Sequence, residues 1–157
     1  MQEGYFKDFD AWNEYAKKLN KNQFDGYFRS REIWWCALGT NIGSEQDGKN
    51  EYFERPVIIL KKMKSDLALI APVTSKISYH KDRVSAIIIG KNSQILLSQV
   101  KVVNEKRLLR RIGYLKIDVF QQTLMDLVSL ILEKEPDGET PPMRRGISEP
   151  EGDVSQV

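Results

Sequence analysis

The sequence is poor in the side chains that most often carry catalysis or hold metals. It has one cysteine, Cys36, and one histidine, His80, among 157 residues. A single cysteine excludes an internal disulfide and a zinc site built from several cysteines. A single histidine excludes a nuclease that works with a pair of histidines. Cys36 follows two tryptophans in an apolar segment, which favours an unreactive core thiol, and His80 lies in the basic segment KISYHKD, which favours a solvated loop.

Long apolar runs and common binding signatures are also missing. The longest apolar runs, such as VIIL and ILL, have the length of strands, and they are far shorter than the about 18 residues that cross a bilayer. The start of the chain, MQEGYFKDFDAW, has no signal pattern, so we expect a cytoplasmic protein without a membrane partner. No GxxxxGKS/T or GxGxxG motif and no group of His, Asp and Glu at ligand spacing occurs, so we expect no metal and no other cofactor.

Neither sign of charge is in large excess, and the net charge is +2. The charges are unevenly distributed, because residues 134–157 carry −3 and the preceding residues carry +5. Segment 135–157 is rich in Pro, Gly and acids, and we expect it to be disordered because it buries too little apolar surface to offset its ordering entropy. The mildly basic remainder permits a nucleic-acid partner without indicating one.

The remaining sequence predicts an α+β fold in which two helices flank a set of strands. Residues 1–25 form an N-terminal helical extension and linker, with Asp8 as the expected N-cap. Apolar residues at spacings of three and four define one stripe on this helix, namely Phe6, Phe9, Trp12, Ala16 and Leu19. The stripe either packs on the domain or meets another subunit or partner.

Residues 26–134 are expected to form one domain, rich in strands. Apolar segments with turn signals between them predict strands at 32–38, 55–63, 66–73, 84–90 and 94–103, with KRLLRRIGYL as a further short one. Tight turns at KSD and KNS indicate an antiparallel meander, and so many short strands favour a small closed barrel, because closure removes exposed edges. The segment VFQQTLMDLVSLILEK predicts a second helix, capped by Asp118 and well buried because most of its surface is apolar.

Short motifs in a fixed order resemble the MazF/PemK family of toxin ribonucleases. A first strand is followed by a GSEQ-x-G loop, an RPV strand, an apolar strand that ends in PVTS, and an LLSQVK strand. Each motif is weak alone, whereas five in the same order are specific. The resemblance runs from about Glu32 to the end of the second helix, and the first helix indicates a subset of the family with an N-terminal extension.

The resemblance implies a small SH3-like barrel of the CcdB/MazF type that forms a homodimer and is neutralised by a cognate antitoxin. It implies cleavage of single-stranded RNA without a metal, through attack by the 2′-hydroxyl and with a cyclic phosphate product. It also assigns catalysis to Arg55 of ERPV and Thr74 of PVTS. A guanidinium offers a fork of donors that matches phosphate oxygens. Because arginine is a poor proton donor, we assign Arg55 to charge stabilisation. The sequence does not identify the general base, and Glu45 is the nearest carboxylate in the loop.

The same resemblance predicts RNA contacts around these two residues. The predicted contacts lie in the groove-bordering loop, after Thr74 and in LLSQVK, and they are Ser44, Glu45, Gln46, Ser75, Lys76, Gln99 and Lys101. The loop residues can equally form a plain polar turn, and Gln99 either recognises a base edge or satisfies a neighbouring backbone group. The run from Lys106 to Lys116 is either a solvated face or a phosphate-tracking strip with Tyr114 as a stacking aromatic.

Aromatic residues leave two further alternatives open. Trp34 and Trp35 point to opposite faces of their strand, so one belongs to the core and the other to a dimer seam or to the underside of the long loop. The segment KNEYFE lengthens the connection before Arg55, and its Tyr52 and Phe53 either stack on bases or pack the loop on one of these tryptophans.

Two other functions are compatible with the same fold. One is a non-catalytic toxin that poisons DNA gyrase, as CcdB does, and the other is an RNA-binding module that has lost its activity. The pairing of Arg55 with Thr74 favours RNA cleavage over the first of these.

Overall fold

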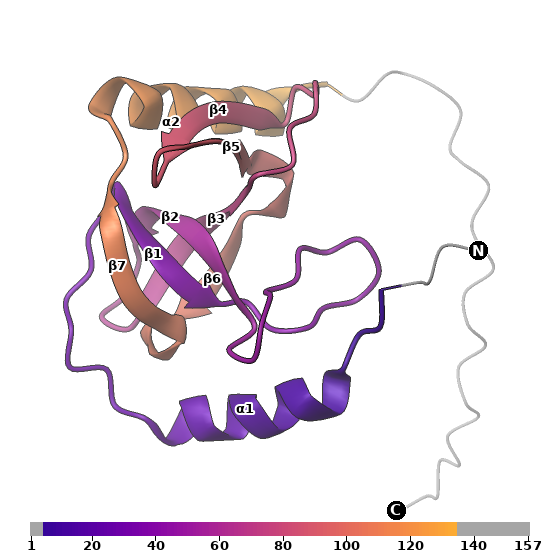
Figure 1. The fold of residues 1–157 in the computed structure, drawn as a ribbon. Coiled ribbons are helices and arrows are strands. Elements are labelled where there is room, and N and C mark those ends of the chain that lie inside the picture. Colours follow the sequence, from indigo (N-terminus) through magenta and orange to yellow (C-terminus); the bar gives the residue numbers. More distant parts are fainter. Residues whose placement is uncertain (1–4, 135–157) are drawn as a thin grey trace, which may run out of the picture.

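The computed structural model describes residues 5–134. In these residues, seven strands form a strongly curled antiparallel sheet, and one helix lies on each side of it (Figure 1). The predicted α+β, SH3-like fold class is therefore confirmed, with the sheet curled into a half-barrel. The predicted disordered tail, 135–157, lies outside the described residues. The helices and strands in chain order are α1 (Phe9–Lys21), β1 (Glu32–Ala37), β2 (Glu54–Lys62), β3 (Leu67–Thr74), β4 (Arg83–Ile88), β5 (Lys91–Leu96), β6 (Lys101–Asn104), β7 (Leu108–Tyr114) and α2 (Ile117–Leu132), with short 3₁₀ turns η1 (Leu97–Gln99) and η2 (Glu105–Arg107).

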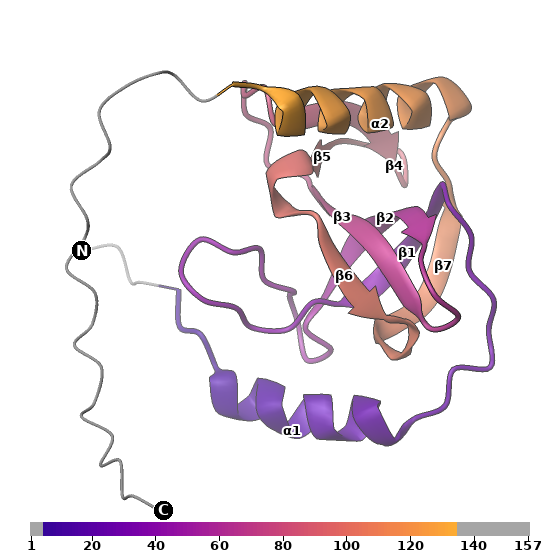
Figure 2. The ribbon, with the colours of Figure 1, turned by 180° about the vertical axis from the view of Figure 1, so that it is seen from behind.

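Strand β3 is the element on which the sheet bends. The strands are ordered β4-β5-β3-β2-β1-β7, and β6 pairs with the same edge of β3 as β5 does. The first half of β3 pairs with β6 and its last residues, Val73 and Thr74, pair with β5 (Figure 2). The predicted simple meander is wrong, because β4 pairs with β5 rather than β3 and β1 lies between β2 and β7.

The predicted single strand 94–103 is also wrong. The turn η1 divides it into β5, which pairs with β4 and with the end of β3, and β6, which pairs with the first half of β3. The KNS residues lie inside β5, and the preceding turn is formed by Ile89 and Gly90, with φ angles of 52° and 68°. Two successive positive φ values are typical of a two-residue hairpin turn.

Two apolar clusters occupy the two faces of the curled sheet. One lies between the sheet and α2 and includes Ile33, Ile58 and Phe120. The other fills the inside of the curl and includes Trp34 and Cys36. Trp35 is only half-buried, so the prediction that the two tryptophans face opposite sides is confirmed.

Helix α1 lies against the lower end of the curled sheet in the view of Figure 1, opposite α2. Asp8 caps it as predicted, since its Oδ1 accepts from the main-chain N of Ala11 at 2.9 Å. The apolar stripe is only partly used: Leu19 is buried, whereas Phe6 is 81% exposed and Phe9 is 43% exposed. Phe6 precedes the first helical residue, so it does not share the helical periodicity that the spacing suggested.

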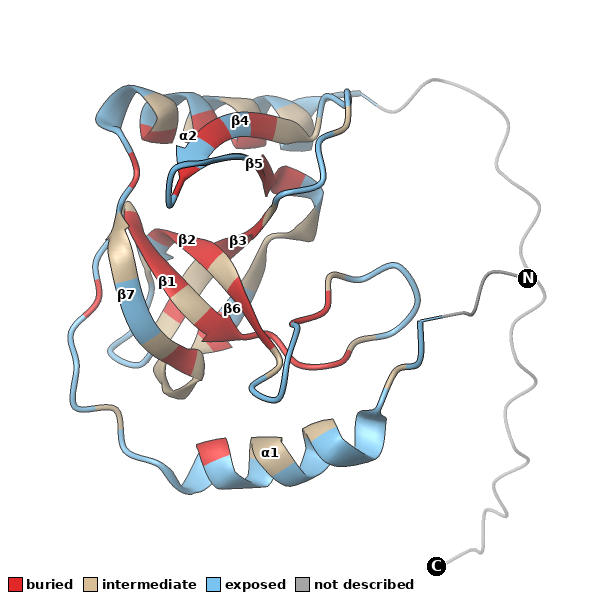
Figure 3. Ribbon diagram, viewed as in Figure 1, coloured by how far each residue is buried: buried red, intermediate tan, exposed pale blue. Residues whose placement is uncertain are grey.

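Helix α2 departs from the prediction in two ways. Its N-cap is Lys116 rather than Asp118, and Asp118 lies in the first turn, where a carboxylate is still favourable. Only Phe120, Thr123 and Leu127 are buried (Figure 3). Large apolar side chains on the rest of the helix are exposed, namely Ile117, Met125, Val128, Ile131 and Leu132. Neither helix in residues 5–134 combines the length and the hydropathy needed to span a membrane.

A substitution at Gly48 tests the packing of the loop before β2. A Cβ atom at this position would lie 1.7 Å from the carbonyl oxygen of Phe53, and backbone cannot yield as a flexible side chain does. We expect Gly48→Ala to lower the free energy of unfolding by about 1–3 kcal/mol, measured by urea denaturation. Gly113→Ala is the control, because a Cβ there has no atom within 4 Å. Equal stability of the two variants would contradict this account of the loop.

Candidate functional site

The residues 49–54 form a small hairpin that packs on α1. Lys49 and Glu54 exchange main-chain hydrogen bonds of 2.8 and 2.9 Å. The ring of Phe53 lies 5.5 Å from that of Trp12 and 6.1 Å from that of Tyr15, measured between centroids. The alternative that Tyr52 and Phe53 pack the loop on Trp34 or Trp35 is therefore wrong, because both rings contact the N-terminal helix.

Gln99, the last residue of η1, holds the loop segment 44–46 in place. Gln99 Oε1 accepts from the main-chain N of Gln46 at 3.1 Å, and its Nε2 donates to the main-chain O of Ser44 at 3.4 Å. Glu45 between them turns back, and its Oε2 accepts from the main-chain N of Ile42 at 2.9 Å. Of the two roles left open for Gln99, the structure shows the backbone contact.

Arg55, at the start of β2, has a buried and firmly oriented guanidinium. Its Nε donates to the main-chain O of Asp47 at 2.7 Å, and its Nη1 donates to the main-chain O of Val73 at 3.2 Å. The other N–H groups remain for an anion, and 8% of the residue is exposed. Burial lowers the pKa of Arg55, while Asp47 and Tyr5 oppose this effect. Arginine stays protonated under such a shift.

Thr74 lies across from Arg55 at the end of β3. Val57 pairs with Pro72, and continuing this register by two residues places Thr74 opposite Arg55. Side chains directly opposite each other share one face of a sheet, and Cys36 on β1 is the other neighbour of Arg55 on that face. Thr74 Oγ1 accepts from the main-chain N of Lys76 at 3.1 Å, which leaves its hydroxyl hydrogen free to donate.

Sequence reasoning missed the buried Gln94, which is the β5 partner of Thr74. Its Nε2 donates to the main-chain O of Ser78 at 2.9 Å, and its Oε1 accepts from the main-chain N of Ser78 at 3.0 Å. Gln94 thus fixes the segment that follows Thr74. The available signal was weak, because Gln94 follows the polar residues KNS and only the residues after it, ILL, are apolar.

The other predicted contact residues surround this centre unequally. Lys101 is half-buried near Glu45 and Cys36, and burial lowers its pKa, with a further lowering by Arg107. Lys76 is exposed. Ser75 lines a cavity of about 310 Å³ that Arg55 also lines, together with Trp35 and Pro56. The structure therefore brings the loop, Gln99, Arg55 and Thr74 together, and Ser75 shares a cavity with Arg55.

The basic run before α2 is engaged within the protein. Arg110 binds both carboxylate oxygens of Glu54, at 2.8 and 2.9 Å, and Arg107 donates to the main-chain O of Ala37 at 3.1 Å. Arg111 contacts Glu32 at 3.4 Å and the hydroxyl of Tyr114 at 3.0 Å. Arg110 and Arg111 remain more than half exposed, so these arginines lie on a solvated face with ion pairs, and their role as a phosphate-tracking strip stays a prediction.

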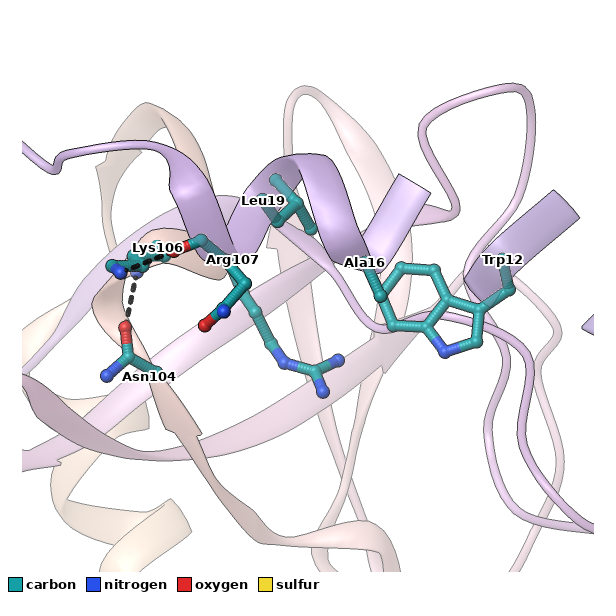
Figure 4. A pocket seen from close by; sticks show the side chains of 7 residues that line it. Trp12, Ala16, Leu19, Asn104, Lys106 and Arg107 are labelled. Atoms are coloured by element: carbon teal, nitrogen blue, oxygen red, sulfur yellow. Dashed lines mark hydrogen bonds between the residues drawn. The ribbon is translucent and has the colours of Figure 1, made fainter. Parts of the chain in front are cut away.

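A second cavity of about 260 Å³ lies between α1 and the turn from β6 to β7 (Figure 4). The guanidinium of Arg107 points towards the ring of Trp12, 5.2 Å from its centroid. Lys106 Nζ donates to the main-chain O of Asn20 at 2.7 Å. The residues that line this cavity include neither Arg55 nor Thr74, so we interpret it as the seam by which α1 is attached.

Cys36 and His80 have the roles that the sequence predicts. Cys36 is fully buried, and burial raises its pKa to about 12. His80 lies in an exposed loop and contacts Asp82. Within residues 5–134, no three His, Cys, Asp or Glu side chains come together as a metal ion would require.

Comparison with known proteins identifies the family. A family model described as PemK-like, MazF-like toxin of type II toxin-antitoxin system matches residues 29–131. The chain belongs to this family. PemK-like, MazF-like toxins are known as endoribonucleases, and the resemblance seen in the motifs is confirmed. The match begins after α1, so the helix lies outside the family domain. No curated protein matches the chain.

Solved structures of MazF toxins share the fold. MazF from Deinococcus radiodurans is 20% identical with a TM-score of 0.58, over 68% of this chain and 98% of that one. The toxin MazF-mt6 from Mycobacterium tuberculosis is 18% identical with a TM-score of 0.52, over 66% and 100%. An endoribonuclease in complex with its cognate antitoxin, from Mycobacterial species, is 11% identical with a TM-score of 0.53, over 69% and 100%. At such identities the likeness shows the fold.

The raised pKa of Cys36 predicts a specific loss of stability at high pH. The folded state keeps the thiol protonated up to about pH 12, whereas an unfolded thiol ionises near its ordinary value of 9.0. The contribution is therefore complete below pH 9 and is lost as the pH rises towards 12. We expect the wild type to lose, relative to Cys36→Ala, about 1.4 kcal/mol of unfolding free energy per pH unit in that range.

Urea denaturation of both proteins at several pH values measures this difference, since other titrating groups cancel between them. Parallel pH profiles would contradict the buried, neutral thiol.

Proposed function

We propose that this protein is the toxin of a type II toxin-antitoxin system and that it cuts single-stranded RNA in the cytoplasm without a metal. The observation that carries the proposal is the Arg55 site in a chain of this family. A buried guanidinium is oriented by two carbonyl groups, lies across from a threonine, and adjoins a loop that Gln99 holds in place.

The proposed reaction uses the 2′-hydroxyl of the RNA as the nucleophile. The 2′-oxygen forms a bond to the adjacent phosphorus, the bond to the 5′-oxygen breaks, and the products are a cyclic phosphate and a 5′-hydroxyl. Since the nucleophile is already attached, the protein has to align it and stabilise the charge on the phosphorane. The free N–H groups of Arg55 and the hydroxyl of Thr74 supply donors for the phosphate oxygens.

Residues around this centre are proposed to bind the RNA strand. The loop residues Ser44, Glu45 and Gln46 border the site, and Lys101 adds a cation near Glu45. Ser75 and Lys76 extend the contact surface beyond Thr74. Glu54 is a poor candidate for the general base although it adjoins Arg55, because both of its carboxylate oxygens bind Arg110.

Substitution of Arg55 tests the proposed mechanism. In the presence of EDTA, we expect Arg55→Ala to cut single-stranded RNA about 100- to 1,000-fold more slowly than the wild type, as the loss of a preorganised donor typically does. Arg55→Lys keeps the charge but loses the donor fork, and we expect little recovery from it. The rate is measured on an end-labelled RNA separated by gel electrophoresis.

Other outcomes assign the protein to a different function. Cleavage that requires magnesium, or that survives Arg55→Ala, overturns the mechanism. Intact RNA together with inhibition of DNA gyrase indicates a gyrase poison, and binding of RNA without cleavage indicates an inactive RNA-binding module.

We further propose that the protein forms a homodimer and that a cognate antitoxin neutralises it. The exposed apolar side chains of α2 support the dimer, because a continuous apolar helix face is costly in water. One of the structural neighbours is an endoribonuclease in complex with its cognate antitoxin. An acidic antitoxin segment would suit the cations of the Arg55 site.

A charge on the outer face of α2 is expected to separate the dimer. Val128 is 54% exposed and Ile131 is 70% exposed, so Val128→Asp and Ile131→Asp place a carboxylate on the proposed interface without disturbing the core. We expect sedimentation velocity to show a dimer for the wild type and a monomer for either variant, since burying an unpaired charge is strongly unfavourable. Ser129→Asp, on an exposed polar position of the same helix, is the control. A wild-type monomer would contradict the proposal.

A further inference from the structure

Lys7, just before α1, is bound to the loop that borders the proposed site. Its Nζ donates to the main-chain O of Asn41 at 2.6 Å and to that of Gly43 at 2.8 Å, and it lies 3.0 Å from Oδ2 of Asp47. These three acceptors match the donor capacity of an ammonium group. The side chains of Lys7 and Asp47 are only 22% and 11% exposed, so the pair is less screened than an ordinary surface ion pair.

Asp47 connects Lys7 to Arg55. Its carboxylate binds Lys7 through Oδ2 and accepts from the main-chain N of Asn41 through Oδ1, at 2.6 Å. Its main-chain O accepts from Nε of Arg55 at 2.7 Å. A single residue therefore lies between the lysine and the guanidinium. The neighbouring Tyr5 also acts on the pKa of Arg55, which places the segment before α1 close to the proposed site.

Helix α1 is anchored to the rest of the protein, and this anchoring fixes the position of Lys7 just before it. Trp12 packs on Phe53 of the 49–54 hairpin, and a Cβ on Gly39 would lie 2.3 Å from the Trp12 ring. Arg107 and Lys106 hold the same helix from the turn between β6 and β7 (Figure 4). The chain on both sides of Gly48 is thus braced from the N-terminal segment, by Lys7 before it and by α1 after it.

We propose that Lys7 is a positioning residue for RNA cleavage, which fixes Arg55 through Asp47. This inference rests on the proposed function. The family match starts at residue 29, so the N-terminal extension adds to the site a support that the family domain does not itself contain. A reacting group that shifts by about 1 Å can lose about 100-fold in rate, and fixed donors act only where they are already aimed.

The test compares Lys7→Met with Lys7→Arg in the full chain. Methionine keeps much of the length but lacks the charge, whereas arginine keeps the charge and several donors. Under single-turnover conditions with saturating single-stranded RNA, we expect Lys7→Met to lower the cleavage rate by about 10- to 100-fold. Lys7→Arg is expected to recover most of that loss. RNA affinity, measured by fluorescence anisotropy, is expected to change less than the cleavage rate, because Lys7 acts mainly on the orientation of Arg55.

Hydrogen exchange of the amides in residues 41–47 is the second measurement. Lys7→Met should raise their exchange rates, because the three acceptors in this segment lose their common donor. Asp47→Asn, which keeps the main-chain O that binds Arg55, should have the same effect on the rate, and the double variant should lose no more than either single variant. Lys17→Met is the matched control, because Lys17 lies on α1 and contacts only Glu14 among the salt-bridge partners in residues 5–134.

The outcomes separate this inference from the function on which it rests. If Lys7→Met cuts as fast as Lys17→Met, or faster than the wild type, Lys7 is not a positioning residue. Failure of Lys7→Arg to recover the rate also overturns the inference, since the charge would then not be the operative property. If the wild type does not cut RNA, the proposed function fails, and exchange in residues 41–47 alone decides whether Lys7 braces the loop.

Discussion

The burial of the Arg55 guanidinium is the constraint that organises this structure. A buried charge requires partners, and Arg55 takes its partners from two places, the Asp47 carbonyl in the loop and the Val73 carbonyl on β3. These two bonds tie the loop to the sheet at the point where β3 passes from β6 to β5. The elements that surround the site, including η1 with Gln99 and the hairpin 49–54, hold the loop that carries the Asp47 carbonyl.

The sequence predicted what depends on local pattern and on short motifs. The helix cap at Asp8, the opposite faces of Trp34 and Trp35, and the inert Cys36 follow from capping chemistry, strand alternation and an apolar neighbourhood. The family followed from the order of motifs. The pairing of Arg55 and Thr74 across β2 and β3 agrees with the expectation that both residues serve one site, while their catalytic roles stay predictions.

What the sequence did not predict depends on contacts between distant segments. Residues 94–103 carry the apolar pattern of one strand, and their division into two appears only in the pairing, since β5 pairs with β4 and the end of β3 while β6 pairs with the first half of β3. Lys7 and Asp47 are 40 residues apart, and no local rule connects them. The burial of α2 was overestimated because the apolar composition of a helix does not show how much of its surface the rest of the same chain covers.

The contact between α1 and the hairpin 49–54 bears on how the protein can be divided. A fragment cut to the family match, residues 29–131, would keep Phe53 and Tyr52 but lose the aromatic rings that cover them. The helix and the hairpin therefore depend on each other for packing and should occur together, although β1 separates them in sequence. Among related chains, a long connection before the arginine should be found where an N-terminal aromatic helix is also present, and a short one where it is absent.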